Sequence, residues 1–211
     1  YFPHNIRNGK RLSSASAFLD KTLKPANLTV ITNANTTRIL TENKKAVGVE
    51  CLVNGQIKVF MANKAITLCG GAINSPKLLE LSVIGRKEVL DNAGIPVTHV
   101  LPGVGENLHD HWNAYIKQGI TNGSTYFTES KPLKMIGNLL RYLFRKEGFL
   151  SNPAALIAVF YQALDDAKTA DAQIHFAPAA SDFDAKGNMV PIEGITVASC
   201  GVRPTSRGAT H

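Results

Sequence analysis

Short runs of apolar and β-branched residues fill the first third of the chain. Such runs, bounded by polar turn residues, are typical of strands. The last two runs are separated by Asn54-Gly55, the pair that most strongly favours a tight hairpin turn. The pattern therefore predicts an antiparallel meander. Its strands are expected at residues Leu28–Thr32, Thr36–Leu40, Ala46–Val53 and Ile57–Ala62.

The next pattern is an apolar run that ends in a pair of glycines. Ala65–Cys69 predicts a strand, Gly70-Gly71 a turn, and Ser75 with Pro76 the N-cap and first residue of a helix. Glycines allow the backbone to approach a ligand closely, and a helix N-terminus suits an anion. The spacing differs from the dinucleotide fingerprint G-x-G-x-x-G. Spacing alone therefore leaves two interpretations open, a nucleotide site and an ordinary packing turn.

Three further helices are predicted. One follows an Asn8-Gly9 turn and covers Ser13–Leu19, and a second covers Arg86–Gly94, with Gly94 at its end. The third carries an apolar face at helical spacing and is expected to stop at Gly148. The favoured interpretation of that face is packing on a core, and the alternative is a membrane surface. Its residues are Leu133, Ile136, Leu139, Leu140, Leu143 and Phe144.

Apolar or alternating runs in the second half predict a second sheet. They cover Ala155–Tyr161, Ala172–Ala177 and Gly194–Cys200. Strands and helices thus follow each other along the whole chain, which favours a mixed α/β (α+β) fold. The character of the sequence changes after Trp112, so we expect one domain over residues 1–111 and another over 112–211.

Composition excludes several classes of protein. A hydrophobic content of 44% and a charged content of 18% describe a globular chain of 211 residues. The net charge of +7 invites a nucleic-acid partner. The basic residues are dispersed, however, and no nucleic-acid motif accompanies them, so none is predicted. Three widely spaced cysteines, Cys51, Cys69 and Cys200, are expected to be small buried side chains in a reducing compartment, so we expect a cytoplasmic protein.

His109-Asp110-His111 is the one stretch that suggests a metal site. Two histidines two residues apart on a strand point to the same side. No third ligand stands at a telling spacing. A metal is therefore not predicted.

Two segments in order carry a resemblance to a known family. Gly71–Ser82 with Ile84-Gly85, and Asn92–Val97 with Leu101–Leu108 and Asp110-His111, resemble the second signature and the following segment of the glucose-methanol-choline (GMC) oxidoreductases. These are flavoenzymes that oxidise alcohols. Pro204–Gly208 resembles the Pro-x-Ser-Arg-Gly turn of the family's substrate domain. The chain departs from the family pattern at three positions: Val83 replaces a usual Gly, Arg86 a Pro, and His109 a Gln.

The resemblance implies FAD as the cofactor. It implies that residues 1–111 are part of an FAD-binding α/β domain with a β-meander, and that 112–211 begin a sheet-and-helix substrate domain. It assigns a backbone contact near the adenine to Thr36. The other cofactor-binding candidates carried over from the family are Gly70, Gly71, Ala72, Asn107, Asp110 and His111.

The expected function is that of an FAD-dependent choline or alcohol dehydrogenase, which passes a hydride from a small alcohol to the flavin and then to an electron acceptor. The family's glycine-rich pyrophosphate loop and its catalytic histidine have no counterpart here, so we expect an inactive internal fragment and assign no catalytic residue. Two alternatives stay open: a non-catalytic remnant of the FAD fold, and a basic binding module. Peripheral membrane contact is a further alternative.

Overall fold

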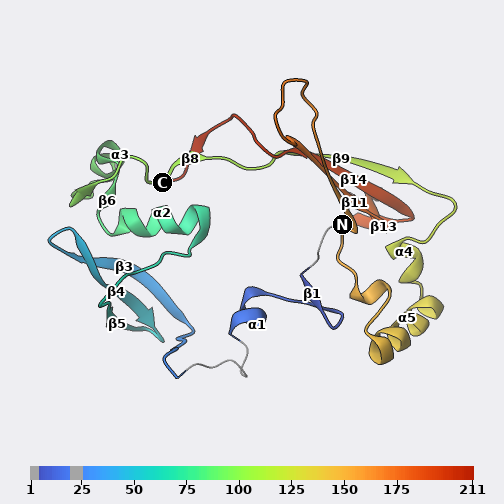
Figure 1. Ribbon diagram of the computed structural model, residues 1–211, viewed down its shortest axis with the longest axis horizontal. Helices are drawn as coiled ribbons and strands as arrows, with labels where there is room; N and C mark the ends of the chain where they lie inside the picture. The colour runs from blue at the N-terminus through green and yellow to red at the C-terminus, as the bar shows by residue number, and fades with distance from the viewer. Residues whose placement is uncertain (1–4, 20–25) are drawn as a thin grey trace. The chain divides into compact units, whose positions relative to one another are not determined.

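The computed structural model describes residues 5–19 and 26–211 and has a mixed α/β architecture (Figure 1). The chain divides into two compact units. Unit 1 contains residues 1–26 and 111–204, and unit 2 contains residues 27–110 and 205–211. The break after Asp110 lies one residue before the predicted domain boundary. Both units are discontinuous, however, whereas the sequence predicted two continuous domains.

A three-stranded antiparallel meander forms one side of unit 2. Its strands are β3 (Ala34–Glu42), β4 (Lys45–Val53) and β5 (Gln56–Met61), in the order β3-β4-β5. Asn54 and Gly55 both have positive φ, 51° and 79°, as the predicted hairpin turn requires. The prediction of this meander is confirmed for three of its four strands.

The fourth predicted strand, Leu28–Thr32, is wrong. These residues form no ladder with any described residue. Val30 is 58% exposed. A run of β-prone residues becomes a strand only when a neighbouring strand satisfies its backbone groups, and among the described residues nothing pairs with this run.

Helix α2 (Gly71–Leu81) packs on β3, as Figure 1 shows. The helix begins five residues earlier than predicted, because Gly70 is its N-cap and Ser75 lies in its second turn. Pro76 is therefore inside the helix, where it cannot donate a hydrogen bond to the carbonyl group of Ala72. A proline normally marks the first turn, and packing on β3 overrides that preference here.

The predicted strand at Ala65–Cys69 is also wrong. The segment pairs with no described strand. It crosses from β5 to α2 as a connection, and its residues line a cavity described below. Its apolar side chains line this cavity and do not belong to a strand of a sheet.

Helix α3 (Lys87–Asn92) confirms the helix predicted at Arg86–Gly94 and its end at a glycine. Gly94 has a φ of 69°, and its N–H donates to the carbonyl oxygen of Asp91. The N–H of Ile95 reaches back to Leu90 O at 2.9 Å. These two bonds form a Schellman motif, which satisfies the last carbonyl groups of the helix.

The remaining strands of unit 2 are short. β6 (Ile84–Gly85) pairs in parallel with β7 (His99–Val100), and β8 (Glu106–Leu108) pairs antiparallel with β15 (Gly208–Ala209). Pairing with β8 is the reason that residues 205–211 belong to unit 2 although they end the sequence.

Unit 1 is built on a four-stranded antiparallel sheet. Its order is β10-β11-β14-β9, and the predicted second sheet is thereby confirmed. The strands are β9 (Asn113–Gly119), β10 (Ile157–Tyr161), β11 (Ala172–Ala177) and β14 (Gly194–Gly201). The other elements of this unit are β1 (Ile6–Arg7), β2 (Lys10–Arg11), α1 (Ser14–Phe18), α4 (Tyr126–Glu129), α5 (Pro132–Arg145), the short 3₁₀ turn at Phe149–Ser151, β12 (Ala180–Phe183) and β13 (Met189–Ile192).

The predicted ends of the helices in unit 1 agree with the structure to different degrees. The N-cap of α1 is Ser13, since its side chain accepts from the N–H of Ser16. The predicted stop of α5 at Gly148 is wrong, because Lys146 already adopts a left-handed conformation with a φ of 57° and caps the helix. Among the described residues, no helix is long and apolar enough to cross a membrane.

Val83 adopts a backbone conformation that β-branched residues avoid. Its φ is 61°, directly after the C-cap of α2. The left-handed region costs a residue with a Cβ atom about 1–2 kcal/mol, and glycine avoids this cost. The departure from the family pattern at this position is therefore a site of local strain.

We expect Val83→Gly to be more stable than Val83→Ala by about 1 kcal/mol, because only glycine relieves the left-handed strain. The free energy of unfolding in urea measures the difference. The matched pair is Val89→Gly and Val89→Ala in α3, where alanine should be the more stable by about 1 kcal/mol. The same order of the two variants at both positions would contradict the assigned strain.

Candidate functional site

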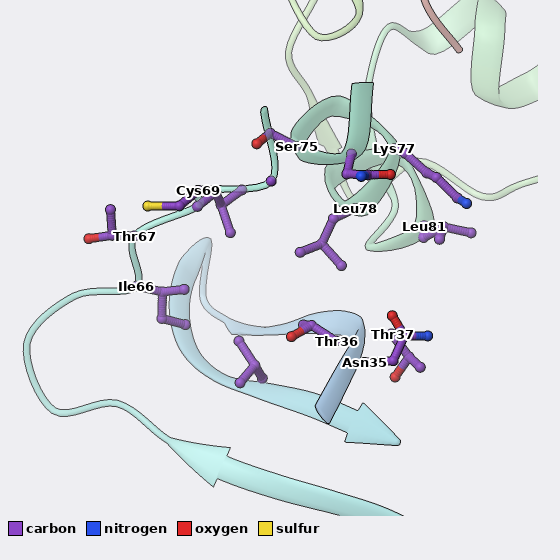
Figure 2. Close-up of a pocket in the computed structure, with 14 residues that line it drawn as sticks. Asn35, Thr36, Thr37, Ile66, Thr67, Cys69, Ser75, Lys77, Leu78 and Leu81 are labelled. Carbon is purple, nitrogen blue, oxygen red and sulfur yellow. The ribbon is translucent and has the colours of Figure 1, made fainter. Parts of the chain in front are cut away.

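A cavity of unit 2 lies between β3, the segment before α2, and α2 itself (Figure 2). Its volume is about 760 Å³. In Figure 2, Leu78 points from α2 toward β3, and Ile66 and Cys69 come from the connecting segment. The residues that line it are Asn35, Thr36, Thr37, Val49, Ile66, Thr67, Leu68, Cys69, Gly70, Asn74, Ser75, Lys77, Leu78 and Leu81.

The wall of this cavity is part apolar and part polar. Ile66 and Leu78 supply apolar surface, and Thr67 and Lys77 supply a hydroxyl group and a cation. Small-molecule sites combine apolar lining with a few polar groups in this way. The cavity can therefore hold a ligand that has an apolar or aromatic body and an anionic or hydroxyl-bearing part.

The first turn of α2 borders the cavity. Gly70, its N-cap, has no side chain and makes no side-chain capping bond. The first N–H groups of a helix have no partner within the helix and carry partial positive charge. They are suited to an anionic or hydrogen-bond-accepting ligand, as the sequence suggested for this turn.

Glycine occupies the two positions of this turn for different structural reasons. A Cβ atom at Gly70 would lie 3.1 Å from atoms of Asn74, so a side chain there would crowd the helix. Gly71 has a φ of 78°, which a residue with a side chain adopts only at a cost. The backbone therefore favours glycine at both positions, whatever the ligand.

The β3 wall contains an irregularity at the cavity. The ladder between β3 and β4 joins Thr36 to Cys51 and then Arg38 to Glu50, so Thr37 is skipped. The Thr37 hydroxyl donates to the carboxylate of Glu50 at 2.7 Å. A bulge of this kind bends the strand and redirects its side chains and backbone, and such bulges occur often beside functional sites.

A buried serine holds the two walls together. Ser82 Oγ accepts the N–H of Ile39 at 2.8 Å and donates to the carbonyl oxygen of Leu78 at 2.6 Å. Ser82 is 1% exposed and Ile39 is 6% exposed. The end of α2 is thus fixed to the middle of β3, which sets the separation of the cavity walls.

The predicted cofactor-binding residues do not all meet at this cavity. Thr36 and Gly70 line it, and Gly71 and Ala72 lie in the adjoining first turn of α2 without lining it. Asn107 belongs to β8, with a φ of 61°, and its carbonyl oxygen contacts His109 Nδ1 at 2.9 Å. Their roles toward a cofactor stay predictions.

Asp110 and His111 lie where the two units divide. His111 Nε2 lies 3.2 Å from Val202 O, and its Nδ1 lies 4.0 Å from Cys200 Sγ. Residues 109–112 form no strand, so the rule that places two histidines of a strand on the same side does not apply to them. In the described part of the chain no group of three or more His, Cys, Asp or Glu side chains is arranged to hold a metal.

Several lining residues were missed from the sequence. Lys77, Thr67 and Cys69 were not named as site residues, although they flank the glycine pair that was. The prediction that all cysteines are buried is wrong for Cys69, which is exposed at the cavity, whereas Cys51 and Cys200 are buried. The signal available was the unpaired apolar segment 65–69, which was interpreted as a strand.

Comparison with known proteins defines the family. Residues 2–113, more than half of the chain, match the family model described as GMC oxidoreductase. The chain therefore belongs to the GMC oxidoreductase family.

Curated relatives include choline dehydrogenases. The chain is 38% identical over 207 residues to the oxygen-dependent choline dehydrogenase of Photobacterium profundum, a match that covers 96% of this chain and 36% of that protein. It is 40% identical over 173 residues to the mitochondrial choline dehydrogenase of Homo sapiens, covering 82% of this chain and 29% of that protein. The chain thus spans about a third of the length of these relatives.

Solved structures share the fold. A formate oxidase matches with a TM-score of 0.80 and 20% identity, over 95% of this chain and 39% of that one. Pyridoxine 4-oxidase from Mesorbium loti matches with a TM-score of 0.71 and 23% identity, over 97% of this chain and 36% of that one. An FAD-dependent oxidoreductase from Chaetomium thermophilum matches with a TM-score of 0.63 and 19% identity, over 85% and 37%. At these identities the likeness concerns the fold.

We expect Ser82→Ala to lower the free energy of unfolding by about 1–3 kcal/mol, because the buried N–H of Ile39 loses its acceptor. Ser130→Ala is the matched control, since the Ser130 hydroxyl bonds to Phe127 O at the surface. Urea unfolding of both variants measures the difference. Equal losses in the two variants would contradict a structural role for Ser82.

Proposed function

We propose that this chain is part of an FAD-dependent oxidoreductase that acts on the CH–OH group of a small alcohol, with choline as the first substrate to test. The cavity of unit 2 would hold the adenosine part of FAD. The observation that carries the proposal is that β3 and the start of α2, 34 residues apart, contribute Thr36 and Gly70 to one cavity. The family resemblance had assigned both residues to the cofactor independently of any structure.

The donor set of the cavity fits this part of FAD. Apolar side chains such as Leu78 offer contact area for a flat base, and the backbone at the Thr36–Thr37 bulge offers polar groups to its edge. The N–H groups of the first turn of α2, together with Lys77, suit the hydroxyl groups and negative charge of the ribose and phosphate part. Bound FAD supplies the redox step by accepting a hydride from the alcohol carbon.

In this proposal, the described residues bind and position the cofactor. No residue of the chain is assigned as the base that removes the alcohol proton. Because the chain spans 36% of the curated relative from Photobacterium profundum, we propose that the remaining machinery belongs to a longer polypeptide. Residues 1–111 would belong to its FAD domain, and 112–211 to its substrate domain.

The names of the relatives support the choice of substrate class. The two curated relatives described above are choline dehydrogenases, and choline is an alcohol. Pyridoxine 4-oxidase, whose fold is similar, is named for a different alcohol. Choline turnover coupled to a dye acceptor, in the complete polypeptide, tests the substrate separately from cofactor binding.

The exposed thiol at the cavity gives a direct test of cofactor binding. We expect FAD to slow alkylation of Cys69 by iodoacetamide at least tenfold, because a ligand in the cavity covers this side chain. Mass spectrometry of the complete polypeptide measures the labelling rate at each cysteine. Cys51 and Cys200, which are buried, serve as internal controls and should label slowly with or without FAD.

Two ligands distinguish the adenosine part from the flavin part. ADP should protect Cys69 as FAD does, and riboflavin, which lacks adenosine, should not. Protection by neither FAD nor ADP would contradict cofactor binding at this cavity and would favour the alternative of a fold that has lost its cofactor. A complex of the polypeptide with DNA that weakens steeply with salt would favour a basic binding module instead.

A further inference from the structure

Helix α5 presents its apolar stripe away from unit 1. Leu133 is 88% exposed and Phe144 is 82% exposed, and no residue of the helix is buried. The favoured expectation, a helix that packs its apolar face on a core, is therefore wrong for the described residues. The stripe follows helical spacing along the full length of α5. Its exposed members are Leu133, Ile136, Leu139, Leu140, Leu143 and Phe144.

Polar contacts join α5 to Glu129 at the end of α4. Asn138 Nδ2 donates to the carbonyl oxygen of Glu129 at 3.1 Å and to its carboxylate at 2.8 Å. Lys134 Nζ lies 3.1 Å from the same carboxylate. Hydrogen bonds from Ser124, Asn138 and Lys134 lower the pKa of Glu129 to about 2, so this anchor stays charged at neutral pH. The helix thus makes polar contacts with α4 and exposes an apolar face.

The charge of the helix has one sign. Between Lys131 and Lys146 there are five basic residues and no acidic ones. Lys131, Lys134 and Arg141 each meet a carboxylate from outside this span. Among the ion pairs of the described residues, none involves Arg145 or Lys146. Positive charge therefore remains at the C-terminal end of the stripe.

A hollow on α5 brings the apolar and cationic groups together. It is lined by Leu140 and Phe144 from the stripe and by Arg141 and Arg145 from its flank. A guanidinium group binds phosphate through two parallel hydrogen bonds, and the adjoining side chains offer apolar surface. This pairing is complementary to an anionic lipid, in which a phosphate group joins apolar chains.

We propose that α5 is a docking surface for an anionic lipid bilayer, on which the helix lies in the plane of the interface. The apolar stripe would enter the boundary between headgroups and acyl chains, and the cations would contact lipid phosphates. Exposed apolar residues occur elsewhere, as on β5, where Ile57 is 68% exposed. Helix α5 differs because its stripe is flanked by cations without intervening acidic residues. This docking is independent of flavin binding.

Sedimentation with lipid vesicles tests the docking. The complete polypeptide should bind vesicles of phosphatidylcholine with 30% phosphatidylglycerol, and bind pure phosphatidylcholine much less. Arg141→Gln with Arg145→Gln should weaken binding to the anionic vesicles roughly thirtyfold, since each surface cation contributes about a factor of five to six. Leu140→Ser with Phe144→Ser should weaken it by a similar or larger factor, because the stripe loses its contact with the acyl region.

Matched variants on β5 and beside it keep the test specific. Lys58→Gln with Lys64→Gln removes two exposed cations, and Ile57→Ser with Met61→Ser removes two exposed apolar side chains; neither pair should change binding more than twofold. Equal binding to neutral and anionic vesicles, or undiminished binding by the α5 variants, overturns the proposal. The proposal is also overturned if the polypeptide binds no vesicles but self-associates, and Phe144→Ser dissociates it. The stripe would then contact a second copy of the polypeptide. If the polypeptide binds no vesicles and Phe144→Ser lowers its melting temperature, the stripe belongs to the polypeptide's own core. This result would also overturn the proposal.

Discussion

One buried hydroxyl group fixes the geometry on which the candidate cofactor site depends. Ser82 Oγ joins the backbone of β3 to the last turn of α2, across 43 residues of sequence. A hydrogen bond in so buried a place has no water to replace it, so its loss costs the full desolvation of the partner. The cavity between β3 and α2 is held open at one end by this bond, and at the other end by the two glycines that begin the helix. A cofactor would meet walls that are already in place.

The elements that local chemistry determines were predicted well. The hairpin at Asn54-Gly55 and the end of α3 at Gly94 follow from residues that tolerate a left-handed backbone. The errors have tertiary causes. Ala65–Cys69 has the composition of a strand, but no described strand pairs with it, and Pro76 has the character of a helix start, but packing extends the helix four residues before Ser75. Periodicity reports which residues avoid water, and it does not report which partner they find.

The candidate site could be predicted only in part, for the same reason. The resemblance to the family selected Thr36 and Gly70, and both line the cavity. The resemblance did not select Lys77 and Cys69. Their position depends on how the connecting segment crosses the end of the meander. The apolar stripe of α5 was identified from its spacing, but its direction was not, since spacing cannot distinguish a face that packs on a sheet from one that faces outward. In the structure, Asn138 bonds to Glu129 from the side of the helix opposite the stripe.

The pairing of β8 with β15 has a consequence for how the chain is made. Leu108 leaves the ribosome about a hundred residues before its partner Gly208. At a typical synthesis rate, unit 2 waits on the order of ten seconds for its last strand. During that interval the residues of unit 1 are being added, and their own sheet needs β14, which also arrives late. Because of this interleaved order, neither unit can complete its strand pairing until β14 and β15 have been synthesised.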